Sequence, residues 1–253
     1  WVGEGRAKPL TRFDGEHTRL DLLKVANIAV VTEELLRKAT LPAERLLRDQ
    51  LVAALAARLD RDFIDPAKTA VAGISPASIT NGITPIVSAG GTADDIRTDV
   101  RAAFQSFINA GNAPTNGVWI MPSTAALNLS LMVNPMGQPE FAGLTMTGGT
   151  FAGLPVIVSD YASAGLVVLV NASDIYITEE GGVQVDLSRE ASLEMADNPA
   201  HDSTTPTPAS LVSMFQTNSV AFRAERFINW ARRRPSGVAV VTGAEWAGAS
   251  ATP

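Results

Sequence analysis

The sequence predicts an α+β fold, and three stretches carry that prediction. Leucines recur at every fourth position between Pro42 and Phe63, which is typical of a long helix with one apolar face. Short apolar runs alternate with helical patterns between Ile86 and Thr178, as in a compact α/β unit around a central sheet. After Glu179 the pattern changes to long strands joined by a polar loop, which predicts antiparallel pairing.

The first forty residues predict an exposed segment, a strand and a short helix. Residues 1–23 mix charge, glycine and proline, with an imperfect strand alternation near the end. Residues 25–31 are mostly small and apolar, as expected where a strand enters a core. Thr32 offers an N-cap hydroxyl, and Glu33 and Glu34 place negative charge in the first helical turn. We therefore expect a helix that continues to Lys38.

The long helix is the clearest local prediction. Its apolar stripe repeats at intervals of four residues and consists of Leu47, Leu51, Leu55, Leu59 and Phe63. Glu44 and Arg48, like Arg58 and Asp62, have the spacing of ion pairs on the solvent side. Asp65-Pro66 ends the helix.

The middle of the chain predicts a crossing segment followed by helix, strand and helix. Residues 67–91 are rich in Gly, Pro, Ser and Thr and predict successive turns. Thr92 begins a helix over 93–110 whose apolar face carries Ile96, Val100, Phe104 and Phe107. A strand over 118–122 and a helix over 123–132 follow, and residues 134–137 form an exposed loop.

The last third predicts strands. Apolar runs at 154–158 and 166–170 belong to the same compact unit, whereas 183–190 and 211–230 predict long antiparallel strands joined by the loop 196–208. The chain thus leaves a first domain, builds a second and returns to the first.

Composition excludes several classes of function. With 253 residues and 46% hydrophobic content the chain can bury a large core. It has no cysteine, so disulfides, thiolate nucleophiles and cysteine metal sites are ruled out. No run of about twenty apolar residues predicts a membrane span, and no secretory signal is visible. The net charge of −6 argues against a dedicated nucleic-acid binder.

A search for catalytic constellations assigns no catalytic, cofactor-binding or metal-binding residue, and no cofactor. The two histidines, His17 and His201, lie in polar segments and are interpreted as solvated loop residues. The glycine pairs at 90–91, 148–149 and 181–182 lack the phosphate-loop patterns and predict turns. Neighbouring acids at 33–34 and 94–95 are explained by helix N-terminal capping. We predict that the protein is not an enzyme.

Several motifs, in one order along the chain, resemble those of tailed-phage major capsid proteins. The start, Trp1-Val2-Gly3-Glu4-Gly5 through Lys8-Pro9 into residues 24–36, resembles the returning strand of the family's extension loop and its entry into the shell domain. Residues 42–63 resemble the spine helix, and Gly153-Leu154-Pro155-Val156 resembles a Gly-x-Pro-Val strand. Residues 185–190 and 224–226, with Arg234-Pro235, resemble the strands that close the fold.

This resemblance implies a Hong Kong 97-like phage capsid fold. It has a peripheral domain with a long spine helix and antiparallel strands, an axial α/β domain and an extension-loop segment. The implied division is 1–24 for the returning part of the extension loop, 25–85 for the first peripheral part with the spine helix, 86–178 for the axial domain, and 179–253 for the second peripheral part and C-terminal strand.

The resemblance also implies a function. A major capsid protein of a tailed phage or prophage assembles into homopentamers and homohexamers of an icosahedral shell around double-stranded DNA, without sequence-specific DNA contact. The expected location is the virion capsid, after assembly in the bacterial host cytoplasm; scaffold, portal and cement proteins are open as further partners, and no membrane is involved. Two alternatives stay open: an encapsulin-like nanocompartment shell that encloses an enzyme cargo, and, more remotely, a small α/β hydrolase.

The expected sites are subunit interfaces rather than catalytic centres. The interface candidates are cations, an acid and an anchor residue in the opening segment, and an arginine run near the C-terminus: Trp1, Glu4, Arg6, Lys8, Arg12, Arg232, Arg233 and Arg234. For the arginine run we expect intersubunit ion pairs.

Some relatives form an isopeptide crosslink between an extension-loop lysine and a neighbour's asparagine, aided by a glutamate. Lys8 matches that lysine position, but Ala224 stands where the glutamate belongs and Asn218 is about one residue from the acceptor. We predict that crosslinking is absent. Relatives also begin with an N-terminal arm and an outgoing strand that this sequence does not contain, so we expect it to be a fragment or a trimmed chain.

Overall fold

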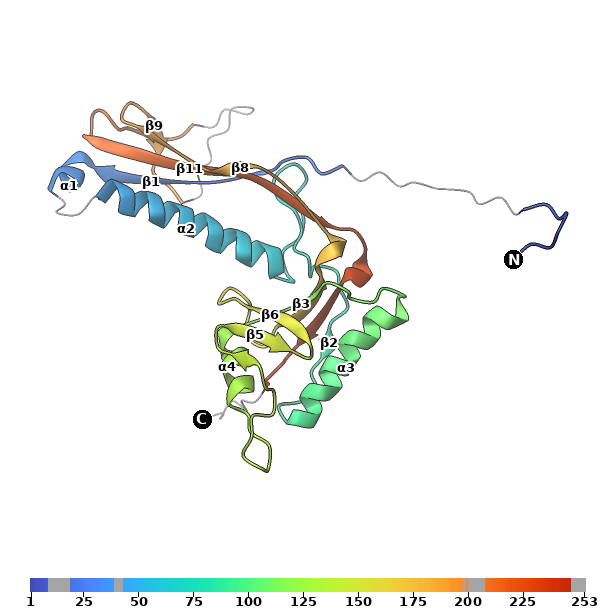
Figure 1. Cartoon of the computed structure of the whole chain (residues 1–253). Coiled ribbons are helices and arrows are strands. Elements are labelled where there is room, and N and C mark those ends of the chain that lie inside the picture. Colours follow the sequence, from blue (N-terminus) through green and yellow to red (C-terminus); the bar gives the residue numbers. More distant parts are fainter. Residues whose placement is uncertain (9–18, 39–42, 198, 200–207, 247–253) are drawn as a thin grey trace.

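The computed structural model describes residues 1–8, 19–38, 43–197, 199 and 208–246. Two structural units account for most of them (Figure 1). The ribbon unit contains a three-stranded sheet and a long helix. The sheet unit contains a seven-stranded sheet flanked by two helices, and two long strands lead from one unit to the other.

The ribbon unit consists of segments that are far apart in the sequence. Its sheet has the order β1-β11-β8 and is antiparallel throughout. Its elements are β1 (Lys24–Thr32), α1 (Glu33–Lys38), α2 (Ala43–Ile64), β8 (Ile175–Ser188) and β11 (Ser219–Arg232). These elements confirm the strand predicted over 25–31, the short helix to Lys38 and the long helix. The predicted first residue of the long helix, Pro42, lies outside the described residues.

Helix α2 packs along one face of the ribbon sheet because its leucine stripe finds apolar partners there. Leu51 and Leu55 are buried with Val220, Phe222 and Ala224 of β11. On its solvent side the predicted ion pairs are present, with 3.0 Å between charged atoms in both the Glu44–Arg48 and the Arg58–Asp62 pair. These exposed pairs contribute a few tenths of a kcal/mol, whereas the buried stripe contributes most of the attachment.

The sheet unit has the strand order β2-β12-β7-β3-β6-β5-β4. Its elements are β2 (Ile86–Val87), α3 (Ala93–Asn109), β3 (Gly117–Met121), α4 (Ser123–Leu131), β4 (Leu144–Thr145), β5 (Gly148–Phe151), β6 (Leu154–Val158), β7 (Val167–Asn171) and β12 (Val238–Thr242). Thr92 begins α3 as predicted, and it forms a capping box, since Thr92 accepts from the Asp95 amide and Asp95 accepts from the Thr92 amide. The predicted helices over 93–110 and 123–132 are confirmed.

The central strands of this sheet bury both faces. Val167 and Leu169 point to a core that includes α3, α4, Trp119 and Trp246. Val168 and Val170 point to the other face, because successive side chains of a strand alternate. That second core also includes Ile64 at the end of α2 and Trp230 near the end of β11, so it joins the two units.

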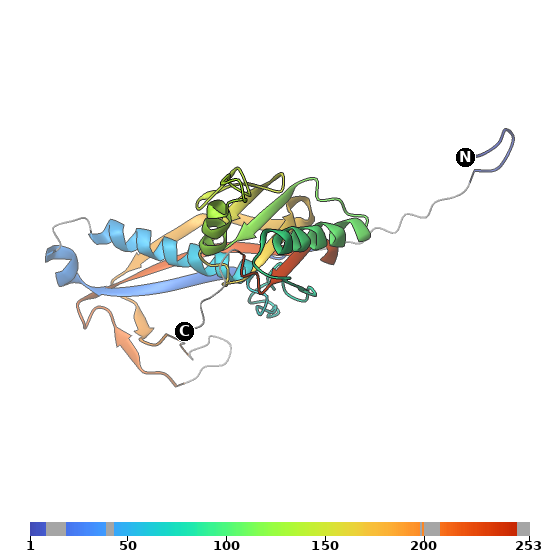
Figure 2. The same ribbon diagram turned by 90° about the horizontal axis from the view of Figure 1, so that it is seen from below.

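The stretch 211–230, predicted as one strand, is two. β10 (Leu211–Ser213) pairs with β9 (Ser192–Glu194), and a turn separates it from β11. The turn is enforced by Asn218, which has a φ of 50°, and by buried Met214, whose amide donates to the Ala191 carbonyl. The prediction of a continuous strand was wrong because the apolar pattern does not reveal this reversal. Figure 2 shows the β9–β10 hairpin projecting from the ribbon unit.

The position of the last strand, β12, bears on the predicted division of the chain into domains. β12 lies between β2 and β7 in the seven-stranded sheet, parallel to β2 and antiparallel to β7. The C-terminal part of the stretch 179–253 therefore packs with the sheet unit rather than with the ribbon. The division of the chain at residues 24, 85 and 178 stays a prediction.

Candidate functional site

The opening segment presents its side chains to solvent. All residues of 1–8 are exposed, among them the interface candidates Trp1, Glu4, Arg6 and Lys8. A turn orders part of it, since the Arg6 amide donates to the Gly3 carbonyl at 3.2 Å and Gly5 has a φ of 73°. Figures 1 and 2 draw this segment apart from both units. The candidate Arg12 lies outside the described residues.

The arginine run has three different environments. Arg232 is half-buried and donates to the Asn81 carbonyl at 2.7 Å, and burial lowers the pKa of its guanidinium. Arg233 has an exposed side chain. Arg234 forms an ion pair within the chain, with its Nε 2.8 Å from an Asp174 oxygen. The structure gives Arg234 an intrachain partner, and an intersubunit role for the run stays a prediction.

Asp174 is the buried carboxylate at the centre of this cluster. Burial by itself would raise its pKa, but hydrogen bonds from Asn112, Arg234 and Asn171, together with the Arg234 charge, outweigh burial and lower the pKa below its ordinary value of 3.8. The residue is therefore ionised at neutral pH. Sequence reasoning missed it, because its partner Asn112 is 62 positions away and no local pattern connects the two.

Of the two crosslink candidates, Lys8 lies in the exposed opening segment and Asn218 lies in the ribbon unit. Asn218 is exposed in the turn before β11, where its carbonyl accepts from the Glu33 amide at 2.9 Å. Ala224, at the position of the family's glutamate, is fully buried against α2. The absence of crosslinking through Lys8 stays a prediction.

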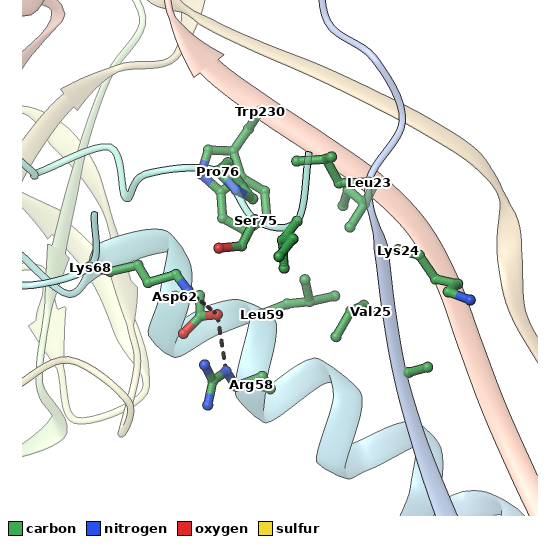
Figure 3. Close-up of a pocket in the computed structure, with 13 residues that line it drawn as sticks. Leu23, Lys24, Val25, Arg58, Leu59, Asp62, Lys68, Ser75, Pro76 and Trp230 are labelled. Carbon is green, nitrogen blue, oxygen red and sulfur yellow. Dashed lines mark hydrogen bonds and ion pairs between the residues drawn. The ribbon is translucent and has the colours of Figure 1, made fainter. Parts of the chain in front are cut away.

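A cleft of 380 Å³ lies in the ribbon unit between the start of β1, the end of α2 and the loop at 74–76 (Figure 3). Its walls are largely apolar and include Leu23, Leu59 and Trp230. Its most prominent polar feature is Asp62, which lies 3.0 Å from Arg58 and 3.5 Å from Lys68. Because these two cations already neutralise the carboxylate, the cleft favours contact with apolar side chains over acid–base chemistry.

Other features of the described residues have structural explanations. Gly149 lets two backbones approach, since a Cβ there would lie 2.1 Å from the Gly143 oxygen, and Gly181, with a φ of 64°, lies where the β8–β11 register shifts. Within the described ranges, no group of three His, Cys, Asp or Glu side chains is placed to hold a metal ion. Likewise, none of the described helices has the length and apolar character needed to span a bilayer. His17 and His201 lie outside these ranges.

A long helix packed on an antiparallel ribbon, a second unit built around a mixed sheet and an exposed opening segment define the Hong Kong 97-like class of phage capsid subunit. Solved structures share this fold. A chain from Mycobacterium phage Adephagia matches with a TM-score of 0.67 at 18% identity, over 96% of this chain and 80% of that one. A chain titled as the capsid of an empty GTA particle matches with a TM-score of 0.60 at 13% identity, over 98% of this chain and 80% of that one.

The chain belongs to the phage capsid family, whose model matches residues 1–243. It is 62% identical to a protein of Pseudomonas phage PAJU2 named "Capsid polyprotein", over 98% of this chain. It is 26% identical to the "Probable major capsid protein gp17" of Mycobacterium phage L5, over 89% of this chain and 70% of that protein. The chain spans only 38% of the length of the PAJU2 polyprotein.

Proposed function

We propose that this chain is a major capsid protein of a tailed phage or prophage, which assembles with copies of itself into an icosahedral shell around double-stranded DNA. The observation that carries the proposal is that the family match and the 62% identical capsid polyprotein both cover nearly the whole chain. The work of the protein is then assembly, and it catalyses no reaction. Its place is the virion capsid, after assembly in the host cytoplasm.

The surface of the isolated subunit supports an assembling protein. Large apolar side chains are exposed at separate edges of the molecule, including Phe215 at the tip of the ribbon unit, 83% exposed, and Met136 in the loop after α4, 87% exposed. Fully burying one such side chain stabilises a contact by roughly 1.5–3 kcal/mol. Contacts of this size are weak singly, but they add up when every subunit of a closed symmetric shell repeats them.

The proposed partners follow from symmetry and charge. Copies of the chain form pentamers and hexamers, in which the exposed segment 1–8 of one subunit contacts a neighbour. DNA fills the shell without sequence-specific contact, in keeping with the net charge of −6. An encapsulin-like shell is disfavoured, because the relatives named above are phage proteins.

Electron microscopy tests the proposal. The protein is expressed, purified and imaged in negative stain. We expect uniform shells or capsomer rings that enclose DNA when produced with the packaging machinery. Monomers at high concentration would contradict the proposal, and shells that enclose a cellular enzyme would favour the nanocompartment.

A further inference from the structure

One buried carboxylate lies where the two units join. The side chain of Asp174 is 1% exposed and has a hydrogen-bond donor on each oxygen. Its Oδ2 accepts from Nδ2 of Asn112 at 2.7 Å and from Nδ2 of Asn171 at 2.9 Å. Its Oδ1 accepts from Nε of Arg234 at 2.8 Å. Donors from three separate segments therefore meet at one residue.

Hydrogen bonds to main-chain carbonyls also connect these segments. The Asp174 carbonyl accepts from the Arg233 amide at 2.7 Å, and Asn112 also donates to the Ser236 carbonyl at 3.1 Å. Directly beyond this point Ile175 pairs with Arg232, the first pair of the two long strands. Asp174 thus lies at the root of the β8–β11 ribbon, where both strands leave the sheet unit.

The backbone is shaped to admit the carboxylate. A Cβ added to Gly237 would lie 2.6 Å from the Cβ of Asp174, a distance that side chains do not adopt. Gly237 does not have a positive φ, so the glycine is required here by space and not by backbone conformation. Replacing a buried ion pair by apolar side chains of similar volume is often neutral or stabilising, so stability alone does not account for such a pair. The arrangement therefore favours a defined geometry over maximal stability.

We propose that Asp174, held by Arg234 and Asn112, fixes the angle between the ribbon unit and the sheet unit and thereby the curvature at which subunits join in a shell. This inference rests on the proposed function. Helix α2, with 22 residues, is about 33 Å long, so a tilt of about 5° at its base moves its far end by about 3 Å. That displacement is several times the spread of about 0.5 Å in normal hydrogen-bond lengths, so it would break polar contacts between neighbouring subunits.

The test compares particles formed by the full chain and by four variants. Asp174→Ala removes the acceptor, and Arg234→Ala removes the cation. Gly237→Ala keeps every polar group but displaces the carboxylate. Arg101→Ala is the control, because Arg101 is an exposed arginine on α3 of the sheet unit and is not among the interface candidates. Particle diameters are measured by cryo-electron microscopy, and thermal unfolding of the unassembled subunits reports folding separately.

We expect the unmodified protein and Arg101→Ala to form one size class. Arg234→Ala and Gly237→Ala should give mixed diameters or open sheets while their unassembled subunits still unfold cooperatively. One size class for both of these variants would overturn the inference even if Asp174→Ala fails to fold. Failure of the unmodified protein to assemble would instead overturn the proposed function, and with it the inference.

Discussion

A second buried carboxylate, Asp99 of α3, is expected to be the most sensitive polar residue of the sheet unit. It is 2% exposed. It accepts hydrogen bonds from the Ser88 hydroxyl at 2.5 Å, the Ala89 amide at 2.9 Å and the Trp246 indole at 2.9 Å. It thereby ties the crossing segment, the helix and the last described residue together.

Asp99→Ala leaves three donors without their acceptor. Trp246 is 1% exposed, so its indole N–H cannot donate to water when the carboxylate is removed. Leaving this buried donor unpaired costs about 1–3 kcal/mol. The Ser88 and Ala89 donors are less buried, and water replaces the carboxylate in part. Together with the lost packing, we expect about 3–5 kcal/mol, which is a large share of a typical stability of 5–15 kcal/mol.

A double-mutant cycle with Trp246→Phe isolates the buried hydrogen bond. Phenylalanine keeps an aromatic ring in the core but removes the N–H group, so Asp99→Ala should cost about 1–2 kcal/mol less in that background. Urea unfolding of unassembled subunits, followed by far-ultraviolet circular dichroism, measures each free energy. Asp94→Ala is the control on the same helix, because Asp94 is exposed and pairs with Arg97, and it should change stability by less than about 0.5 kcal/mol.

Two results would refute the reasoning. If Asp99→Ala and Asp94→Ala had equal effects, the three hydrogen bonds would contribute nothing beyond a surface ion pair. If the effects of Asp99→Ala and Trp246→Phe were additive, the hydrogen bond between the indole and the carboxylate would not contribute to stability.

Three further predictions concern the ribbon, the junction and the arm. Leu55→Ala, at a 2% exposed position between α2 and the ribbon sheet, should destabilise the subunit by about 2–5 kcal/mol in urea unfolding, whereas Leu46→Ala at a 56% exposed position should stay within about 0.5 kcal/mol. Because folding lowers the pKa of Asp174, its ionisation stabilises the protein above pH 3.8, and this contribution disappears as the pH falls through the lower folded pKa. The difference in free energy of unfolding between the unmodified protein and Asp174→Asn should therefore be constant above pH 3.8 and shrink below it. A difference that grows on acidification would contradict the assignment. Mature particles boiled in detergent should run as monomers with Lys8 or with Lys8→Arg, and a covalent ladder that disappears in the variant would show that crosslinking occurs.

Local chemistry is sufficient to predict much of this fold. The stripe of leucines predicts α2 because a period near four places them on one helical face, and the structure buries Leu51 and Leu55 there. Thr92 predicts the start of α3 because its hydroxyl accepts from an amide only three residues away. These interactions are contained in short stretches, so the sequence displays both partners together.

Other features depend on partners that are distant in the sequence. β4 and β5 were not predicted, because they are short, rich in glycine and paired through backbone groups. The place of β12 depends on β7, about seventy residues earlier, and a strand pattern does not name its neighbour. The Asp174 cluster could not be predicted for the same reason, since Arg234 is 60 positions away from Asp174.

The end of β11 shows why such distant contacts matter for an assembling protein. Three side chains there donate to main-chain carbonyls of distant segments: Asn229 to Asp21, Trp230 to Ala77 and Arg232 to Asn81. With the Asp174 cluster directly beyond, one strand end holds the base of the exposed arm, the crossing loop and the sheet unit. Since backbone carbonyls do not depend on side-chain identity, these segments can vary in sequence while their positions stay fixed. In a symmetric shell, an error in the angle between segments is repeated at every subunit contact. The relative positions of the segments therefore matter more than the identity of their surface side chains.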